Sequence, residues 1–372
     1  MSDKHLYEIA LSLIPKIGPV MAKALLSYCG SAEAVFMSNR KSLLKIPGIG
    51  PTLVDTIQQS KALSQAEYEL EKLHRHGIQT VFYTDPEYPQ RLRQNMDCPM
   101  LLYCKTSDIH LLNANRILGI VGTRKPTDRG RAVCEAIVDG LLPYDVLVVS
   151  GLAFGIDICA HRRACLNGTP NFAVLAHGLG SIYPLQHKRT ALQIAEHGGL
   201  ISEHPISTEA DPRFFPMRNR IISGMCDALL VVETQTAGGS MISAELADQY
   251  GREIFAVPGR IGDTQSAGCN LLIKTERAHL CESAADIASR MRWDEDLPVN
   301  HGVQSRLFSD LSEEEVKIVE AIRLAPEIQI DTLAYTTRIP STRLNGLLLS
   351  LELQGLLRTL PGKRYRLQNG AL

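Results

Sequence analysis

The sequence lacks the features of membrane-spanning and exported proteins. No apolar run reaches the roughly 18 residues that a membrane-spanning helix needs, and the first residues, MSDKHLYEIA, do not have the layout of a signal peptide. The nine cysteines include no C-x-x-C pair and no Cys/His cluster at zinc spacing. We therefore expect a cytoplasmic protein without membrane contact or bound metal, with its thiols buried as small hydrophobic side chains.

Several catalytic signatures are also missing. The chain contains no G-x-x-x-x-G-K-[ST], no H-E-x-x-H and no G-x-S-x-G, and Gly119, Gly122 and Gly130 are not at the spacing of a dinucleotide fingerprint. These absences argue against a P-loop ATPase, a zinc protease, a serine hydrolase and a nicotinamide enzyme. We expect no catalytic residue and no cofactor. The formal net charge of −1 leaves only local basic clusters as an indication of nucleic-acid binding.

The most informative stretch is a strand, a glycine turn, a helix and a second strand. Apolar residues 117–121 are followed by Gly122-Thr123-Arg124-Lys125, a helical pattern covers 128–141, and apolar residues 146–149 stop before Gly151. A right-handed crossover makes such strands parallel, so both glycine turns meet at one sheet edge. Backbone N–H groups there are unpaired and favour an anion. With its basic side chains the first turn predicts a phosphate site; the alternative is a structural turn with solvated cations.

Apolar runs alternate with helical patterns over about 150 residues, which predicts a doubly wound α/β fold. We assign it to residues 64–290, and residues 291–310 are polar and indicate a linker. Residues 311–372 predict three helices and a hairpin, the pattern of a winged helix, with arginines at 358, 364 and 366 and a lysine at 363 in the wing. This module could contact DNA or dock a protein.

Residues 1–63 form a small helical domain with two similar pieces. LIPKIGPVMAKALLSYCG and LLKIPGIGPTLVDTIQQS each place Gly-Pro before an amphipathic helix. This pattern is typical of a helix-hairpin-helix, in which Gly18 and Gly48 or Gly50 occupy the turns and the next helix offers N–H groups to a phosphate. The alternative is a domain used for packing or protein contacts.

A second basic cluster lies in PRFFPMRNRIISG. It places three arginines beside two phenylalanines and an asparagine: Arg213, Arg218, Arg220, Phe214, Phe215 and Asn219. Guanidinium groups bind phosphates bidentately, and aromatic rings stack on unpaired bases of any sequence. Together with the first turn and with Lys188 and Arg189, which follow Tyr183-Pro184, these residues predict a cleft that follows a single strand, provided that the arginines face the same rim.

The remaining polar candidates have structural explanations as well. Asp157 stands at a helix start, where an acid caps N–H groups. Glu203 and Glu233 follow strand ends, and our hypothesis is that they order arginine side chains. Glu233 followed by Gly239 and Ser240 also resembles the carboxylate and glycine loop of a nucleotide phosphoribohydrolase, which we keep as the enzymatic alternative. A scaffold whose end domains bind proteins is the third possibility.

Long motifs carry a resemblance to a known family. In order they are VGTRKPTDRG, SGLAFGIDICAH, a YP after a glycine-rich turn, SEHP, FPMRNRIISG, VVETQTAGGSMISA and GREIFAVPG. The chain resembles the DNA-processing protein A (DprA/Smf) family of bacterial transformation proteins. It departs from the pattern G-x-G-x-D-x-x-Y-P-x-x-N at Ala176, Gly180 and His187.

The resemblance implies a Rossmann-like sheet flanked by a helix-hairpin-helix or SAM-like domain and a winged helix. It implies single-stranded DNA binding, a homodimer formed through the Rossmann-like domain, and loading of the RecA recombinase during natural transformation. By motif, Arg124 corresponds to the arginine of the family's G-[ST]-R turn, and Arg218 and Arg220 to its FPxRNR pair. The DNA-binding residues we expect are Gly122, Thr123, Arg124, Lys125, Gly151, Lys188, Phe214, Arg218, Asn219, Arg220, Gly239 and Ser240.

Overall fold

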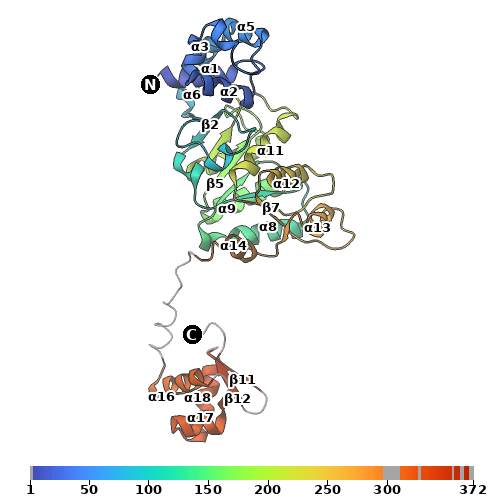
Figure 1. The fold of residues 1–372 in the computed structure, drawn as a ribbon. Coiled ribbons are helices and arrows are strands. Elements are labelled where there is room, and N and C mark those ends of the chain that lie inside the picture. Colours follow the sequence, from blue (N-terminus) through green and yellow to red (C-terminus); the bar gives the residue numbers. More distant parts are fainter. Residues whose placement is uncertain (1–2, 296–310, 326–327, 354–355, 361–363, 368–372) are drawn as a thin grey trace. The chain divides into compact units, whose positions relative to one another are not determined.

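The computed structural model describes residues 3–295, 311–325, 328–353, 356–360 and 364–367 (Figure 1). By their internal contacts, residues 1–295 and 296–372 form two separate units. The first unit contains an N-terminal group of helices and a large sheet with helices on both faces; the second is a small α/β module with its own core. No helix among the described residues is both long and apolar enough to cross a membrane.

The N-terminal helices of the first unit share one hydrophobic core. Gly18 and Gly50 adopt extended conformations immediately before proline-led helices, and Gly48 has a φ of +80°, which permits the tight turn. The last helix of the group packs against the first. The helices are α1 (Asp3–Leu13), α2 (Pro19–Cys29), α3 (Ala32–Met37), α4 (Arg40–Leu43), α5 (Pro51–Gln59) and α6 (Ala62–His76).

The sheet has nine strands in the order β1-β2-β6-β5-β4-β3-β7-β8-β9. The strands from β6 to β9 in this order are parallel, whereas β2 pairs antiparallel with both β1 and β6. The predicted doubly wound sheet is therefore confirmed, with an antiparallel edge added. The strands are β1 (Gln79–Phe82), β2 (Leu101–Thr106), β3 (Ile117–Val121), β4 (Leu147–Ser150), β5 (Asn171–Leu175), β6 (Gly199–Ser202), β7 (Ala228–Val231), β8 (Glu253–Ala256) and β9 (His279–Leu280).

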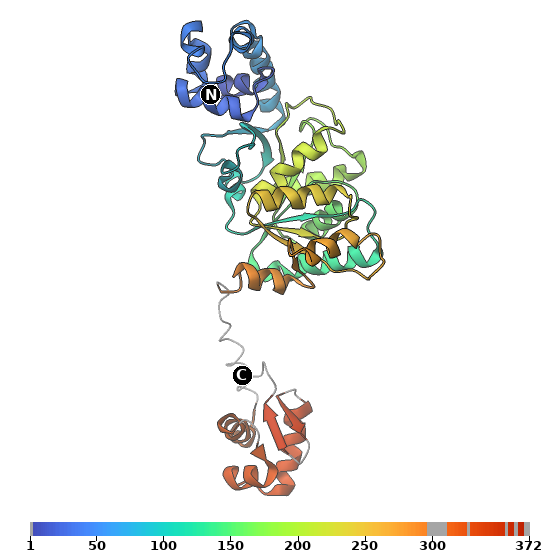
Figure 2. The ribbon, with the colours of Figure 1, turned by 45° about the vertical axis from the view of Figure 1, so that its right-hand side comes forward.

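Helices cover both faces of the sheet (Figure 2). Alternate residues of β3 show the division: Leu118 and Ile120 pack with α8, α9 and α14, whereas Ile117 and Val121 pack with α11, α12 and α13. The helices are α7 (Gln90–Arg93), α8 (Asp128–Gly140), α9 (Ile156–Asn167), α10 (Lys188–His197), α11 (Phe214–Met225), α12 (Gly239–Gln249), α13 (Ala267–Lys274) and α14 (Ala284–Met291), with short 3-10 turns at Ile109–Asn113, Leu142–Tyr144 and Leu185–His187.

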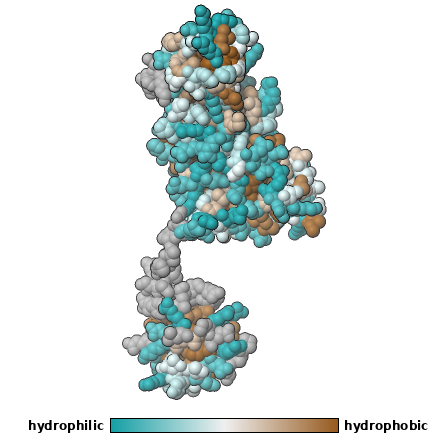
Figure 3. Space-filling view, in the orientation of Figure 1, coloured by the Kyte–Doolittle hydropathy of each residue, from teal (hydrophilic) through white to brown (hydrophobic). Residues whose placement is uncertain are grey.

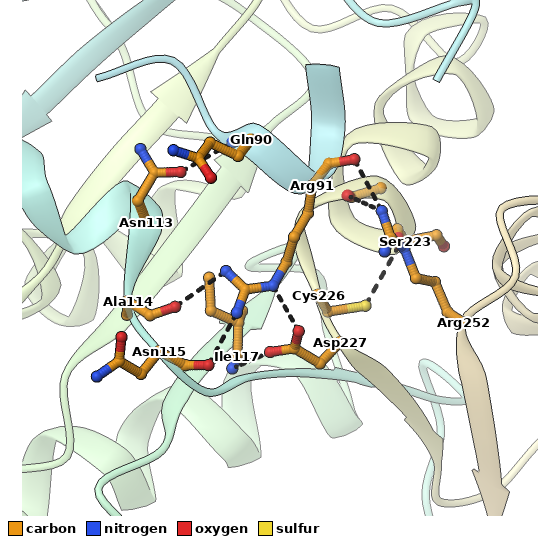
Figure 4. A network of polar contacts seen from close by, with 11 residues as sticks. Gln90, Arg91, Asn113, Ala114, Asn115, Ile117, Ser223, Cys226, Asp227 and Arg252 are labelled. Atoms are coloured by element: carbon orange, nitrogen blue, oxygen red, sulfur yellow. Dashed lines mark hydrogen bonds and ion pairs between the residues drawn. The ribbon is translucent and has the colours of Figure 1, made fainter. Parts of the chain in front are cut away.

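A polar clamp closes the amino ends of the central strands (Figure 4). The Arg91 guanidinium donates to Asp227 Oδ1 at 2.5 Å and to the carbonyls of Ala114 and Asn115 at 2.9 and 2.8 Å. Asp227 Oδ2 in turn accepts from the Ile117 N–H at 2.8 Å. This arginine is therefore used internally, and the open edge of the sheet is the opposite one, at the carboxyl ends.

The second unit has the predicted winged-helix arrangement. It contains α16 (Glu313–Leu324), α17 (Ile330–Thr337), α18 (Ser341–Leu353) and a sheet of β10 (Ile328–Gln329), β12 (Arg364–Leu367) and β11 (Leu357–Leu360). Ser312 and Glu315 form the predicted capping box. Arg343, at the start of the candidate recognition helix, pairs with Glu314. The predicted wing turn, including Lys363, and most of the predicted linker lie outside the described residues.

Most apolar side chains are used inside these cores. The face seen in Figure 3 is mainly hydrophilic, with hydrophobic colour in limited areas.

Candidate nucleic-acid interface

A cavity of about 640 Å³ opens at the carboxyl ends of the parallel strands. The turns after β3, β4, β5 and β7 contribute to its wall, together with the first half of α11. A cavity at this edge is expected for a doubly wound sheet, because the turns and helix starts there point outward. The lining includes nine of the predicted residues: Gly122, Thr123, Arg124, Lys125, Gly151, Arg218, Asn219, Gly239 and Ser240.

Arg124 is an exposed cation of this cavity, next to the exposed Lys125. Its guanidinium carbon lies 5.4 Å from the centroid of the Phe215 ring, a distance at which the ring attracts the cation. Within the described ranges, no carboxylate pairs with Arg124. Its charge is therefore available to an anionic ligand at the cavity mouth.

The turn that carries Arg124 is held from both sides. The Thr123 N–H donates to the carbonyl of Glu233 at 2.7 Å, and Gly155, with a φ of +87°, lies so close that an added Cβ would overlap the Thr123 carbonyl oxygen. Only glycine fits this approach.

The Glu233 carboxylate fixes the start of α8. It accepts from the N–H and the hydroxyl of Thr127 at 2.9 and 2.6 Å, and Thr127 caps the helix through the Gly130 N–H. Among the described residues no arginine pairs with Glu233, so the hypothesis that it orders an arginine is wrong; its carboxylate holds Thr127 instead.

Arg218 is a buried cation rather than an exposed one. Only 3% of the residue is exposed, and its guanidinium donates to the carbonyls of Gly151, at 2.6 Å, and Val174. An added Cβ on Gly151 would lie 2.6 Å from Arg218 Cζ, so this glycine makes room for the arginine. Burial lowers the pKa of Arg218 to about 10, which leaves it charged at neutral pH.

Asp157 complements Arg218 from the start of α9. Its Oδ2 accepts from the N–H groups of Gly151 and Ala153 at 3.1 and 3.4 Å, so it supports the turn before the helix. Burial raises the pKa of Asp157, and the nearby Arg218 charge opposes this shift. The Gly151 peptide is thus held by a carboxylate on its N–H side and by a guanidinium on its carbonyl side.

The start of α12 provides unused polar groups. The N-terminal cap, Gly238, offers no side chain to the helix, and the Ser240 hydroxyl is buried without a hydrogen-bonding partner. Both residues and Gly239 line the cavity. Free amides and a hydroxyl at a helix start suit a phosphate oxygen.

Three predicted residues do not line the cavity. Arg220 pairs with Glu203 and donates to the Asp97 carbonyl. It therefore does not face the cavity rim with the other arginines, as the prediction required. The expectation that Glu203 orders an arginine is confirmed. Phe214 packs on His204, with ring centroids 4.3 Å apart. Lys188 is exposed at the first residue of α10.

Helical periodicity could have separated these residues. Counting from Phe215, the positions i, i+3, i+4 and i+7 are Phe215, Arg218, Asn219 and Ile222, and all four line the cavity. Arg220 belongs to another face of the helix. Other lining residues that sequence reasoning did not select are Phe154, His177, Tyr183, Gln235 and Gln265.

Nothing in the cavity suggests a metal centre. Over the residues that the structure describes, no group of three or more His, Cys, Asp or Glu side chains is placed to hold an ion.

Comparison with known proteins agrees with this architecture. The family described as DNA recombination-mediator protein A matches residues 79–292, a SAM-like helix-hairpin-helix tandem matches 8–60, and the DprA winged helix domain matches 306–363. Protein Smf of Escherichia coli is 34% identical over 288 residues, which cover 76% of this chain and 75% of that protein.

Similar solved structures include two of DNA processing protein A. DNA processing protein A from Streptococcus pneumoniae is 30% identical with a TM-score of 0.65, covering 78% of this chain and 98% of that one. A structure of DNA processing protein A from Helicobacter pylori, described as giving insights into its unique single-stranded DNA binding mode, is 26% identical with a TM-score of 0.53 and covers 58% of this chain and 96% of that one. The match to the recombination-mediator domain and the extent of the identity with Protein Smf show that this chain belongs to the DNA recombination-mediator protein A (DprA/Smf) family.

Proposed function

We propose that this protein binds single-stranded DNA in the cavity at the carboxyl ends of the strands and acts as a recombination mediator in natural transformation. The observation that carries the proposal is Arg124, an exposed guanidinium at the cavity mouth with an aromatic ring beneath it and no carboxylate partner among the described residues. The single-stranded DNA binding described for the Helicobacter pylori relative supports it.

The cavity offers three kinds of contact to a strand. Arg124 and Lys125 neutralise phosphates, the ring of Phe215 stacks on a base, and the amides at the start of α12 and the Ser240 hydroxyl donate to a phosphate oxygen. Gly122, Thr123 and Gly239 bring the backbone close to the strand, and Asn219 provides a side-chain amide. Arg218 contributes a buried positive charge to the cavity wall and, through its bond to the Gly151 carbonyl, holds the turn after β4 in place.

Binding without catalysis fits the carboxylates of this site better than the hydrolase alternative does. Glu233, the acid that a phosphoribohydrolase would use, accepts two hydrogen bonds from Thr127, and Asp157 accepts from two backbone amides. Both carboxylates therefore have structural roles, Glu233 at the start of α8 and Asp157 at the turn before α9, which supports binding over hydrolysis. We therefore propose that the protein is not an enzyme.

Arg124→Ala tests the proposal in the full chain. Fluorescence anisotropy with a labelled oligo-dT should show an affinity loss of at least tenfold, and the slope of log K against log salt should flatten by about 0.7, the value for one lost phosphate contact on a single strand. Arg290→Ala, a half-exposed arginine of α14 that pairs with Glu253, is the matched control. Wild-type affinity of the Arg124 variant would contradict the proposal.

The partners follow from the family resemblance. We propose that the protein forms a homodimer through its Rossmann-like domain and loads RecA onto the bound strand, working in the cytoplasm. Light scattering on the purified chain should give twice the monomer mass, and RecA should assemble faster on strands coated with this protein.

A further inference from the structure

Two further aromatic residues lie at the rim of the cavity. Tyr183 and Phe154 both line it and remain 54% and 44% exposed. The Tyr183 ring lies 6.1 Å from the Phe215 ring at an interplanar angle of 61°, and Phe154 lies 4.8 Å from the His187 ring at 69°. These edge contacts hold each ring in position, while about half of each residue stays open to a ligand.

Exposed cations stand next to this aromatic rim. His187 is followed directly by Lys188 and Arg189, which are exposed on the first turn of α10. Arg162 is exposed on α9, the helix that packs against α10. Burial lowers the pKa of His187, and the Arg162 charge adds to this shift. In the described portion of the chain, none of these three cations pairs with a carboxylate.

The cavity alone holds only a short piece of a strand. A volume of about 640 Å³ falls in the range of pockets that enclose one drug-sized ligand. A longer strand must therefore continue over the surface, and the rim with exposed rings beside unpaired cations offers both contacts that a strand uses.

We propose that Tyr183, Phe154, Lys188, Arg189 and Arg162 form an exit segment for single-stranded DNA: bases leaving the cavity stack on the two rings, and the following phosphates meet the three cations. The inference rests on the proposed function, because it assumes that the strand starts in the cavity. It adds a binding segment that determines how many nucleotides one molecule covers.

The test compares a short and a long oligonucleotide on the full chain. Labelled dT3 is the short ligand, which needs only the cavity under the proposal, and dT15 is long enough to continue over the exit segment. Tyr183→Leu and Phe154→Leu keep apolar bulk but remove the ring, and each should weaken dT15 binding about tenfold, with a smaller loss for dT3. Tyr28→Leu, which changes a 62% exposed tyrosine of α2, should leave both affinities unchanged.

The cations give a second, independent readout. The double variant Lys188→Ala/Arg189→Ala should flatten the salt slope of dT15 by roughly 1.4, twice the value for one phosphate contact, and should leave the dT3 slope unchanged. Phe154→Trp should show fluorescence quenching with dT15 but not with dT3; it covers the case in which a leucine variant fails to fold.

The two proposals fail in different ways. The exit segment would be overturned if the Tyr183 and Phe154 variants lost equal affinity for dT3 and dT15, or lost none for dT15. In that case Arg124→Ala would still weaken dT3 binding, and the cavity proposal would stand. Normal dT3 binding by the Arg124 variant would instead remove the cavity proposal.

Discussion

Replacing Arg218 by methionine should destabilise the first unit strongly. The substitution keeps the volume of the side chain but removes the donor to the Gly151 and Val174 carbonyls and the cation beside Asp157. An orphaned buried polar group costs about 1–3 kcal/mol, and breaking a buried charge pair about 3–5 kcal/mol. Because Asp157 can take up a proton and become neutral, we expect a total loss of about 3–5 kcal/mol in the free energy of unfolding.

The single tryptophan makes the assay specific. Trp293 is buried in the core of the first unit, so its fluorescence during urea denaturation follows that unit and not the winged helix. With a urea m value of about 3 kcal/mol per M, the midpoint should fall by roughly 1 M or more.

Arg163→Met is the matched control for this experiment. Arg163 pairs with Asp139, but its side chain is 37% exposed, and exposed pairs contribute little to stability. If the urea midpoint of Arg218→Met is no lower than that of Arg163→Met, the stabilising role assigned to Arg218 beneath the cavity is refuted.

Two further predictions concern buried groups. Glu69 of α6 is buried and accepts from the Ile206 N–H at 2.5 Å, so Glu69→Ala should lower the free energy of unfolding by about 1–3 kcal/mol. Glu69→Gln should recover most of this loss, and replacing the exposed Glu67 by alanine should change little, as measured by urea denaturation. Burial lowers the pKa of His161 to about 4, so the unfolded chain binds the extra proton first as pH falls below its ordinary value near 6.5. The contribution of His161 to the free energy of unfolding should therefore be constant above that pH and decrease toward pH 4, by up to about 2 kcal/mol at pH 5. The His204 imidazole, whose pKa burial also lowers to about 4, acts in the same direction. If replacing His161 by asparagine left the loss of stability between pH 7.5 and 5 unchanged, the buried neutral imidazole would be contradicted.

Much of the fold could be predicted from local patterns. Apolar runs bounded by glycine turns identified the central strands because parallel strands are buried on both faces. The antiparallel pairing of β2 with β6 could not be predicted, since it joins residues about a hundred positions apart and depends on packing rather than on local composition. The short strand β9 carries too few residues for a periodic signal.

The site could be predicted only in part, because a motif does not show the direction of a side chain. FFPMRNR contains two phenylalanines and two arginines, and one of each faces the cavity while Arg220 is neutralised by Glu203 from a distant loop. Helical spacing would have selected Phe215 over Phe214. The partner of Arg220 required the tertiary structure.

Photo-crosslinking tests the central claim, that the strand lies in the cavity at the carboxyl ends of the sheet, most directly. An oligo-dT that contains 4-thiothymidine is irradiated in complex with the full chain, and the crosslinks are mapped by mass spectrometry after trypsin digestion. The main crosslink should lie on the peptide that carries Phe215, and the next on the peptide that carries Tyr183. The crosslinks should disappear in Arg124→Ala. Crosslinks confined to residues 3–76 or to the winged helix, with none at the cavity, would contradict the account.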